Sequence, residues 1–320
     1  MRRYIFIRIL ALIPVWLGIS VLAFVLSNLA PGDPATVLAH RLSDAPPSEE
    51  QIAAIRREYH LDDPLPVRYA RWLASAAQGD LGVSYRTKQP VLKELAAHFP
   101  ATLEIAGAAL IIALVIAVPL GVLAAVRRGS WLDHAARVVS LLGASLPSYW
   151  LGYLLILFFA LALGLLPVAG REQSSGFVLP ALTLGLGMAA TLARLTRSSL
   201  LDVLGQDFIR TARAKGLSER VIIRRHALKG ALIPVITIIG IAFGHLLGGA
   251  VIVERIFAWP GIGTLIVDSI YDRDYPMIQG FVLFMGAIFT VLSLAADLSY
   301  LWIDPRIRLA RTLRMKRMHR

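Results

Sequence analysis

Six long apolar stretches that contain no Lys or Arg divide this 320-residue chain, and they constrain its fold more than any other feature. They lie at about residues 9–30, 101–126, 138–166, 177–193, 231–253 and 275–303. Each stretch is close to the ~20 residues that an α-helix needs to cross ~30 Å of hydrocarbon. A soluble protein would need six helices that are apolar on every side. We therefore predict an all-α, multi-pass membrane protein with six transmembrane helices.

The net charge of +12 follows the alternation of these stretches. Of the 33 Lys and Arg, 22 lie in the alternate segments that include both ends of the chain, and 11 lie in the other segments. Basic residues are concentrated on the cytoplasmic side of membrane proteins. We therefore expect both termini and residues 207–234 to lie in the cytoplasm. Contact with anionic membrane lipid explains the excess of basic residues, and we expect no binding of nucleic acid.

The chain lacks the residues that common catalytic sites require. It has no cysteine, no Gly-Lys dipeptide, no His-Glu-x-x-His and no Gly-x-Ser-x-Gly. The missing Gly-Lys pair excludes a P-loop for ATP. We therefore expect no enzyme activity, no catalytic residue, no metal site and no cofactor bound by this chain.

The most polar segment of the second half, residues 207–234, is predicted to form two short helices around a glycine; we call it the elbow. The first helix, 207–215, has an acidic start and a basic end, which suit the helix dipole. Gly216 suits the left-handed position that follows a helix. Ser218 is predicted to cap the second helix, with Glu219 in its first turn. A folded elbow between two spans predicts a docking site for a partner.

Residues 211–217, 225–228 and 232–234 of the elbow resemble the coupling loop of ABC-importer permeases, in particular of the peptide/nickel branch. Ala212 and Gly216 match the general family pattern, whereas Arg210 and Thr211 stand where that pattern has an acidic residue and an alanine. No single side chain can therefore be identified as the essential one. The resemblance implies an ATPase-coupling role for Asp207, Arg210, Thr211, Ala212, Arg213, Ala214, Lys215, Gly216 and Leu217.

Further matches cover nearly the whole chain in order, at residues 31–34, 61–65, 79–82, 257–263, 273–276 and 304–308. The resemblance implies a protein of the inner (cytoplasmic) membrane with the type I ABC importer (MetI-like) permease fold and an extracytoplasmic subdomain between helices 1 and 2. The expected division is 1–96 for the first helix and this subdomain, 97–303 for the permease domain with a coupling loop at 200–230, and 304–320 for a basic cytoplasmic tail.

The function implied by the resemblance is that of a permease subunit of an ATP-driven importer of small peptides or of nickel or metal chelates. Its implied partners are a second homologous permease, two ABC ATPase subunits that bind ATP and Mg, and an extracytoplasmic solute-binding protein. Dipeptides, oligopeptides, glutathione and nickel or metal chelates all remain open as substrates. A self-contained secondary transporter or channel is the alternative, and it would predict an internal repeat and charges at mid-bilayer.

The fifth stretch is rich in glycine and contains one histidine. Gly240, Gly244 and Gly248 recur every four residues, which lets helices approach closely or leaves room for a solute. Gly249 and His245 belong to the same candidate set for helix packing or the pathway. We expect His245 to face protein or a cavity, as a hydrogen-bonded histidine rather than a metal ligand. Glu104, at the end of the second stretch, is expected to pair with a nearby arginine or to be capped by water.

Residues 31–100 are long enough to form an ordered external subdomain. Ser48 is predicted to cap a helix with Ile52, Ile55 and Tyr59 on one face, and a second short helix is predicted around Trp72. This subdomain could cover the pathway or receive a binding protein, or it could be a packing element that steadies the first span.

Overall fold

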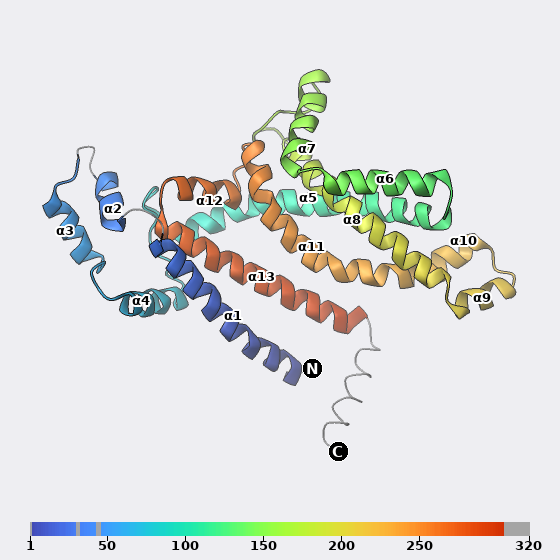
Figure 1. Ribbon diagram of the computed structural model, residues 1–320, viewed down its shortest axis with the longest axis horizontal. Helices are drawn as coiled ribbons and strands as arrows, with labels where there is room; N and C mark the ends of the chain where they lie inside the picture. Colours follow the sequence, from blue (N-terminus) through green and yellow to red (C-terminus); the bar gives the residue numbers. More distant parts are fainter. Residues whose placement is uncertain (1, 30–32, 43–45, 304–320) are drawn as a thin grey trace, which may run out of the picture. The chain divides into compact units, whose positions relative to one another are not determined.

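The computed structural model describes residues 2–29, 33–42 and 46–303 of the chain, and these residues are almost entirely helical (Figure 1). No β-strand occurs among them, which confirms the all-α prediction. The predicted tail, 304–320, lies outside the described residues. The helices are α1 (Arg2–Leu29), α2 (Pro34–Leu42), α3 (Glu49–Glu58), α4 (Leu65–Ala77), α5 (Val91–Val126), α6 (Trp131–Ser145), α7 (Ser148–Leu155), the π-helix η1 (Ile156–Ala162), α8 (Val178–Leu204), α9 (Asp207–Ala214), α10 (Glu219–Val221), the π-helix η2 (Ile222–Ala227), α11 (Leu228–Ile256), α12 (Ile262–Tyr271) and α13 (Tyr275–Ile303).

Within the described part of the chain, five helical segments are long and apolar enough to cross a membrane, or six if one bent pair is counted as a single span. The bent pair is α6 with α7 and η1, which meet at 105°. The predicted start of the third span, at residue 138, is corrected, because α6 begins earlier, at Trp131. The helix breaks before Ser148, at the position where the sequence indicates a kink or break. Pro147 accounts for the break, since it has no N–H to continue the hydrogen-bond ladder.

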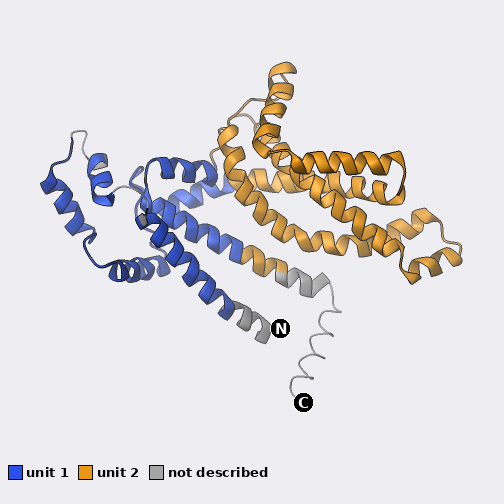
Figure 2. Ribbon diagram, viewed as in Figure 1, with its two compact units in different colours: residues 1–100, 261–290 blue, residues 101–260, 291–320 orange. Residues whose placement is uncertain are grey.

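The described chain divides into two compact units (Figure 2). Unit 1 comprises residues 1–100 and 261–290, and unit 2 comprises residues 101–260 and 291–320. In unit 1, Ser48 caps α3 through its side chain and forms a capping box with Gln51, as the sequence predicts. Ile55 of α3 is buried against α2, whereas Tyr59 is exposed. The second predicted helix is α4.

Asp274 connects two parts of unit 1 that lie far apart in the sequence. Its buried carboxylate accepts hydrogen bonds from the hydroxyl of Ser84 and from the backbone N–H groups of Tyr85, Arg86 and Met277. A buried carboxylate is stable only when such donors replace its lost hydration. Asp274 therefore holds the loop that precedes α5 against the start of α13.

In unit 2, α8 lies at the centre and packs against α6, α7 and α11. Two glycines allow α5 and α8 to approach closely. A Cβ atom on Gly121 would lie 2.6 Å from the carbonyl oxygen of Ala193, and one on Gly185 would lie 2.9 Å from that of Ala109. Helix pairs in contact at such small residues leave no space for a side chain. The two helices are therefore closely fitted over much of their length.

Candidate functional site

The elbow projects from the end of α8 as a helix, a turn and a second helical segment. Helix α9 spans Asp207–Ala214, which confirms the predicted first helix to within one residue. Asp207 stands in its first turn and Arg213 in its last, so the charges at both ends suit the helix dipole. The chain then turns and continues through α10 and η2 into α11 without another loop.

Gly216 makes the turn, with a φ of +75° in the left-handed region. The N–H of Gly216 donates to the carbonyl of Arg213, and that of Leu217 donates to the carbonyl of Ala212. This pair of bonds is a Schellman motif, in which a left-handed residue satisfies the last carbonyls of a helix. No atom lies within 4 Å of the Cβ position at Gly216, so the backbone conformation alone requires glycine here.

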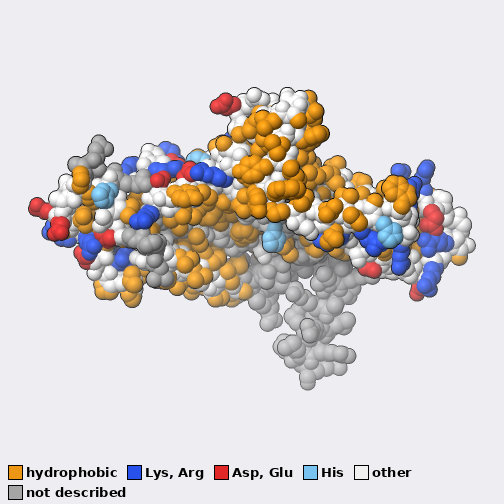
Figure 3. Space-filling view, turned by 45° about the horizontal axis from the view of Figure 1, so that its top comes forward, with side chains coloured by type: hydrophobic (Ala, Val, Ile, Leu, Met, Phe, Trp, Pro, Cys, Tyr) orange, Lys and Arg blue, Asp and Glu red, His pale blue; other side chains and the backbone are white. Residues whose placement is uncertain are grey.

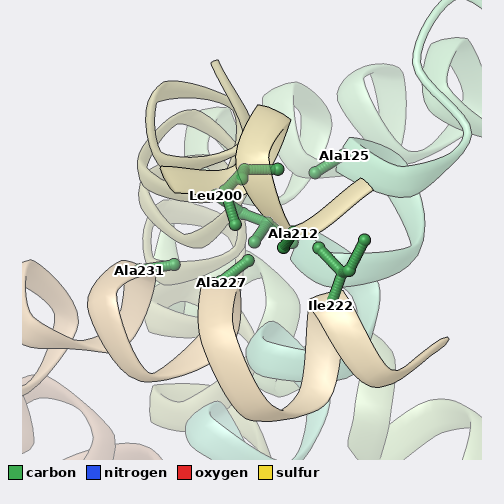
Figure 4. Close-up of a cluster of buried hydrophobic side chains, with 7 residues drawn as sticks. Ala125, Leu200, Ala212, Ile222, Ala227 and Ala231 are labelled. Atoms are coloured by element: carbon green, nitrogen blue, oxygen red, sulfur yellow. The ribbon is translucent and has the colours of Figure 1, made fainter. Parts of the chain in front are cut away.

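A cluster of buried apolar side chains holds the elbow on the spans (Figure 4). Ile209 and Ala212 are the buried residues of α9, and Ile209 is completely inaccessible. They meet side chains of α5, α8, η2 and α11. The full cluster is Ala125, Leu200, Ile209, Ala212, Ile222, Ala227 and Ala231. Burial of an Ile-sized side chain contributes about 1.5–3 kcal/mol, so α9 is anchored rather than loose.

Of the predicted coupling residues, Ala212 alone is buried. The exposed ones are Asp207, Arg210, Thr211, Arg213, Ala214, Lys215, Gly216 and Leu217. Figure 3 shows Lys and Arg side chains gathered over the end of unit 2 that carries α9 and α10. Arg213 joins the two arms of the elbow by bonding Glu219, with the closest N···O distance at 2.6 Å. The outer face of the elbow is therefore predominantly basic, with Phe208 and Leu217 exposed among the charged side chains, and it is open to a partner.

The predicted side-chain cap by Ser218 is wrong. Ser218 does occupy the N-cap position of α10, with an extended backbone, but its hydroxyl makes no cap hydrogen bond. The N–H of Val221, the natural donor to such a cap, instead donates to the backbone carbonyl of Ser218. The backbone thereby takes the donor that the side chain would have used.

The sequence analysis missed a buried ion pair near the elbow. Arg197 of α8 contacts Asp133 of α6 with its Nε and one terminal nitrogen, at 2.7 and 2.9 Å. The N–H of Gly129 also donates to Asp133, which is 1% exposed. Asp133 lies three residues after Ser130, the residue that caps α6, and its backbone N–H donates to the Ser130 side chain. This local pattern does not indicate a partner 64 residues away.

The candidate glycines of α11 do not share one neighbour. A Cβ atom on Gly240 would lie 2.8 Å from Ala296, and one on Gly249 would lie 3.7 Å from Leu184. Gly244 is buried, whereas Gly248 is exposed and has no atom within 4 Å of its Cβ position. Only part of the glycine repeat therefore serves close packing within this chain.

His245 is exposed on α11, and the described residues provide it with no hydrogen bond. The expected hydrogen-bond partner of His245 is thus not found among the described residues of this chain. His245 shares its face with Ile241, Gly248 and Ile252, all exposed, because α8 packs against another side of α11. The structure leaves this face of α11 open.

A second polar group lies at the other end of the unit 2 spans. Arg171 bonds Glu104 at 2.7 Å, as predicted for that carboxylate, and stacks over the ring of Trp259. Trp259 is buried and donates to the carbonyl of Ala101, while Glu254 accepts from Thr102. Among the residues that the structure describes, no three His, Asp or Glu side chains gather as a metal site would require.

Apolar spans with a folded elbow seated on their ends define a multi-pass membrane protein with an exposed, predominantly basic surface. Residues 117–309 match the family described as binding-protein-dependent transport system inner membrane component, and residues 1–106 match the N-terminal family of the same membrane components. The chain belongs to this family. It is a multi-pass inner-membrane protein and a permease subunit of an ABC importer of the peptide/nickel type, which confirms the resemblance seen in the sequence.

Relatives and a solved structure agree with this assignment. The chain is 42% identical over 308 residues to the glutathione transport system permease protein GsiC of Salmonella paratyphi A, covering 96% of this chain and 99% of that protein. It is 41% identical, with the same coverage, to GsiC of Escherichia coli K12. Its fold resembles the inward-facing MetNI methionine ABC transporter, with a TM-score of 0.56 and 22% identity over 66% of this chain and 96% of that chain.

Proposed function

We propose that this chain forms one half of the pathway of an ATP-driven importer and that the elbow receives an ATPase subunit. The complete importer then contains a second, homologous permease, two ABC ATPases that bind ATP and Mg, and an extracytoplasmic binding protein. The observation that carries the proposal is the elbow itself, a polar, exposed helix held on the spans by a buried apolar cluster. ATP-driven movement of the ATPases would reach the spans through this contact.

The packing around the elbow supports transmission as a rigid body. Helix α9 follows directly on α8, and α8 is joined to α6 by the Arg197–Asp133 pair and to α5 by the close approach at Gly121. Closely packed elements shift as units rather than deform continuously. A push on α9 would therefore move α5, α6 and α8 together and change the access of the pathway.

The charge distribution supports a cytoplasmic elbow. Of the 33 Lys and Arg, 22 lie in the segments on the same predicted side as the elbow and both termini. The ATPases act in the cytoplasm, so this orientation presents the elbow to them.

We propose small peptides, with glutathione as the leading candidate, as the substrate class. The support is the 41–42% identity, over nearly the full length, to permeases named for glutathione transport. Specificity is expected to depend largely on the separate binding protein.

The experiment measures ATP turnover of the assembled importer in proteoliposomes, with and without glutathione and the binding protein. Gly216→Val should abolish stimulation by substrate, because a β-branched residue strains the left-handed turn. Gly164→Val is the matched control, since Gly164 has a φ of +64° and equally open space but lies outside the elbow. Loss in the first variant only supports coupling.

Full stimulation in Gly216→Val would overturn the coupling role of the elbow. Purification of the chain without any ATPase, even after gentle crosslinking, would instead favour a self-contained transporter.

A further inference from the structure

A cavity of about 510 Å³ in unit 1 lies beside the end of α1, and the transport role described above does not use it. Along α1 it is lined by Val21, Phe24, Val25 and Asn28. Val21 and Asn28 are seven positions apart in the helix, a rise of about 10 Å. Because Leu10–Asn28 is a candidate membrane span, the cavity extends from the membrane boundary into the hydrocarbon.

The facing wall comes from α4 and the segment before it. Phe24 of α1 packs against Tyr69 and Trp72 of α4, with ring centroids 5.4 and 5.8 Å apart, and the Tyr69 hydroxyl hydrogen-bonds that of Ser20. These contacts fix α4 on α1. The cavity is therefore bounded by elements that are packed together and is not a gap beside a loose loop.

A second cavity, of about 340 Å³, adjoins the first within unit 1. The two share Phe24, Asn28, Pro34, Leu61 and Arg68 as lining residues. Among the residues that the structure describes, Arg68 is the only basic one that lines both. An occupant of either cavity can therefore reach the same guanidinium.

Arg68 differs from the other two arginines that line these cavities. Arg56 pairs with Asp33 at 3.1 Å, and Arg71 pairs with Asp63 at 2.9 Å. In the part of the chain that the structure describes, no carboxylate lies within ion-pair distance of Arg68, which is half-buried. A partly desolvated cation is stabilised by an anion, and the planar guanidinium suits the oxygens of a phosphate.

We propose that these cavities hold one anionic phospholipid, with its phosphate at Arg68 and an acyl chain along Val21 and Val25. The position in the membrane favours a lipid over a soluble peptide. Arg68 and Val21 line the same cavity, so a lipid that extends from the boundary into the hydrocarbon can contact both. Basic pockets between membrane helices recognise anionic headgroups by the same physics.

The test uses the full chain, purified in mild detergent and placed in phosphatidylcholine nanodiscs with and without phosphatidylglycerol. Native mass spectrometry counts the lipid that stays bound. Arg68→Gln should weaken retention of phosphatidylglycerol on the order of tenfold, as expected for loss of a charged hydrogen bond. Arg57→Gln is the matched control, since Arg57 is exposed on α3 in the same unit and lines neither cavity, and it should retain the lipid.

A second variant covers the case in which Arg68→Gln does not fold. Val21→Trp should fill the apolar end of the cavity and release the lipid while Arg68 remains. Equal retention of phosphatidylglycerol in wild type, Arg68→Gln and Val21→Trp would overturn the proposal. Displacement of the lipid by inorganic phosphate or by a soluble dipeptide would also overturn it, because the site would then recognise a free anion. Equal retention of phosphatidylcholine would overturn recognition of headgroup charge.

Discussion

Arg197 of α8 donates two hydrogen bonds to the carboxylate of Asp133 in α6, across 64 positions of sequence. Asp133 is 1% exposed and Arg197 is 21% exposed by side chain, so the pair is largely removed from solvent. Arg137 approaches the same carboxylate at 3.7 Å from a more exposed position. Asp133 thus fixes the orientation of α6 on α8, the central helix of unit 2.

Asp133→Ala should lower the free energy of unfolding by about 3–5 kcal/mol, because it leaves the Arg197 charge without its partner. The measurement is unfolding of the purified chain in mixed micelles with increasing denaturing detergent. Arg137→Gln is the control and should cost less than about 1 kcal/mol, as exposed pairs do. Equal losses of unfolding free energy in the two variants would show that the buried pair contributes no more to stability than the exposed contact of Arg137.

Gly121→Ala should destabilise the chain by about 1–3 kcal/mol through overpacking, since the new methyl would lie 2.6 Å from Ala193 O and from the Thr196 side chain. Gly107→Ala tests the same substitution in the same helix, where no atom lies within 4 Å. That variant should be neutral or slightly stabilising, because alanine favours helix. Thermal unfolding in detergent measures both, and a stable Gly121→Ala would contradict the close approach of α5 and α8.

Arg213→Glu should weaken association with the ATPase subunit while changing thermal stability little, because the Arg213–Glu219 pair is solvent-exposed. Co-purification of the ATPase with the tagged permease measures the effect. The double variant Arg213→Glu with Glu219→Arg restores an ion pair across the turn but not the original charge at position 213. Recovery of ATPase binding in the double variant would mean that the pair, and not the surface charge, matters.

Tyr85 should lose its phenolic proton at an unusually high pH. Burial and then the nearby charge of Asp274 raise the pKa of its phenol from 10.0 to about 12. The unfolded chain releases this proton near pH 10 while the folded chain keeps it, so stability from this group is complete below pH 10 and falls as the pH rises toward 12. Ultraviolet absorbance of tyrosinate during a pH titration should show a late component. Tyr85→Phe should remove that component, and Tyr271→Phe, at an exposed position, should leave it.

Local features of this fold could be predicted from neighbouring residues. The capping box at Ser48, helix α9 and the left-handed turn at Gly216 each depend on a few consecutive positions. The six apolar stretches likewise fixed the class of fold, because spanning a bilayer sets helix length directly.

Features that depend on distant partners could not be predicted in this way. The Asp133–Arg197 pair, the contacts of Asp274 and the exposure of His245 all follow from which helix faces meet. Ser218 stands at the expected N-cap position, but its hydroxyl makes no cap hydrogen bond, because the N–H of Val221 donates to the backbone carbonyl of Ser218. The sequence indicated where the elbow begins and turns, and tertiary packing determined which of its side chains remain available.

Four of the seven side chains in the cluster beneath the elbow are alanines, at positions 125, 212, 227 and 231. An alanine methyl has no rotamers, so this contact has few side-chain rearrangements with which to absorb a displacement of α9. In a cluster of methionines or leucines, changes in side-chain χ angles would absorb part of a displacement of α9 before the helices moved. Here the helices themselves must move, so the contact between α9 and the spans is rigid.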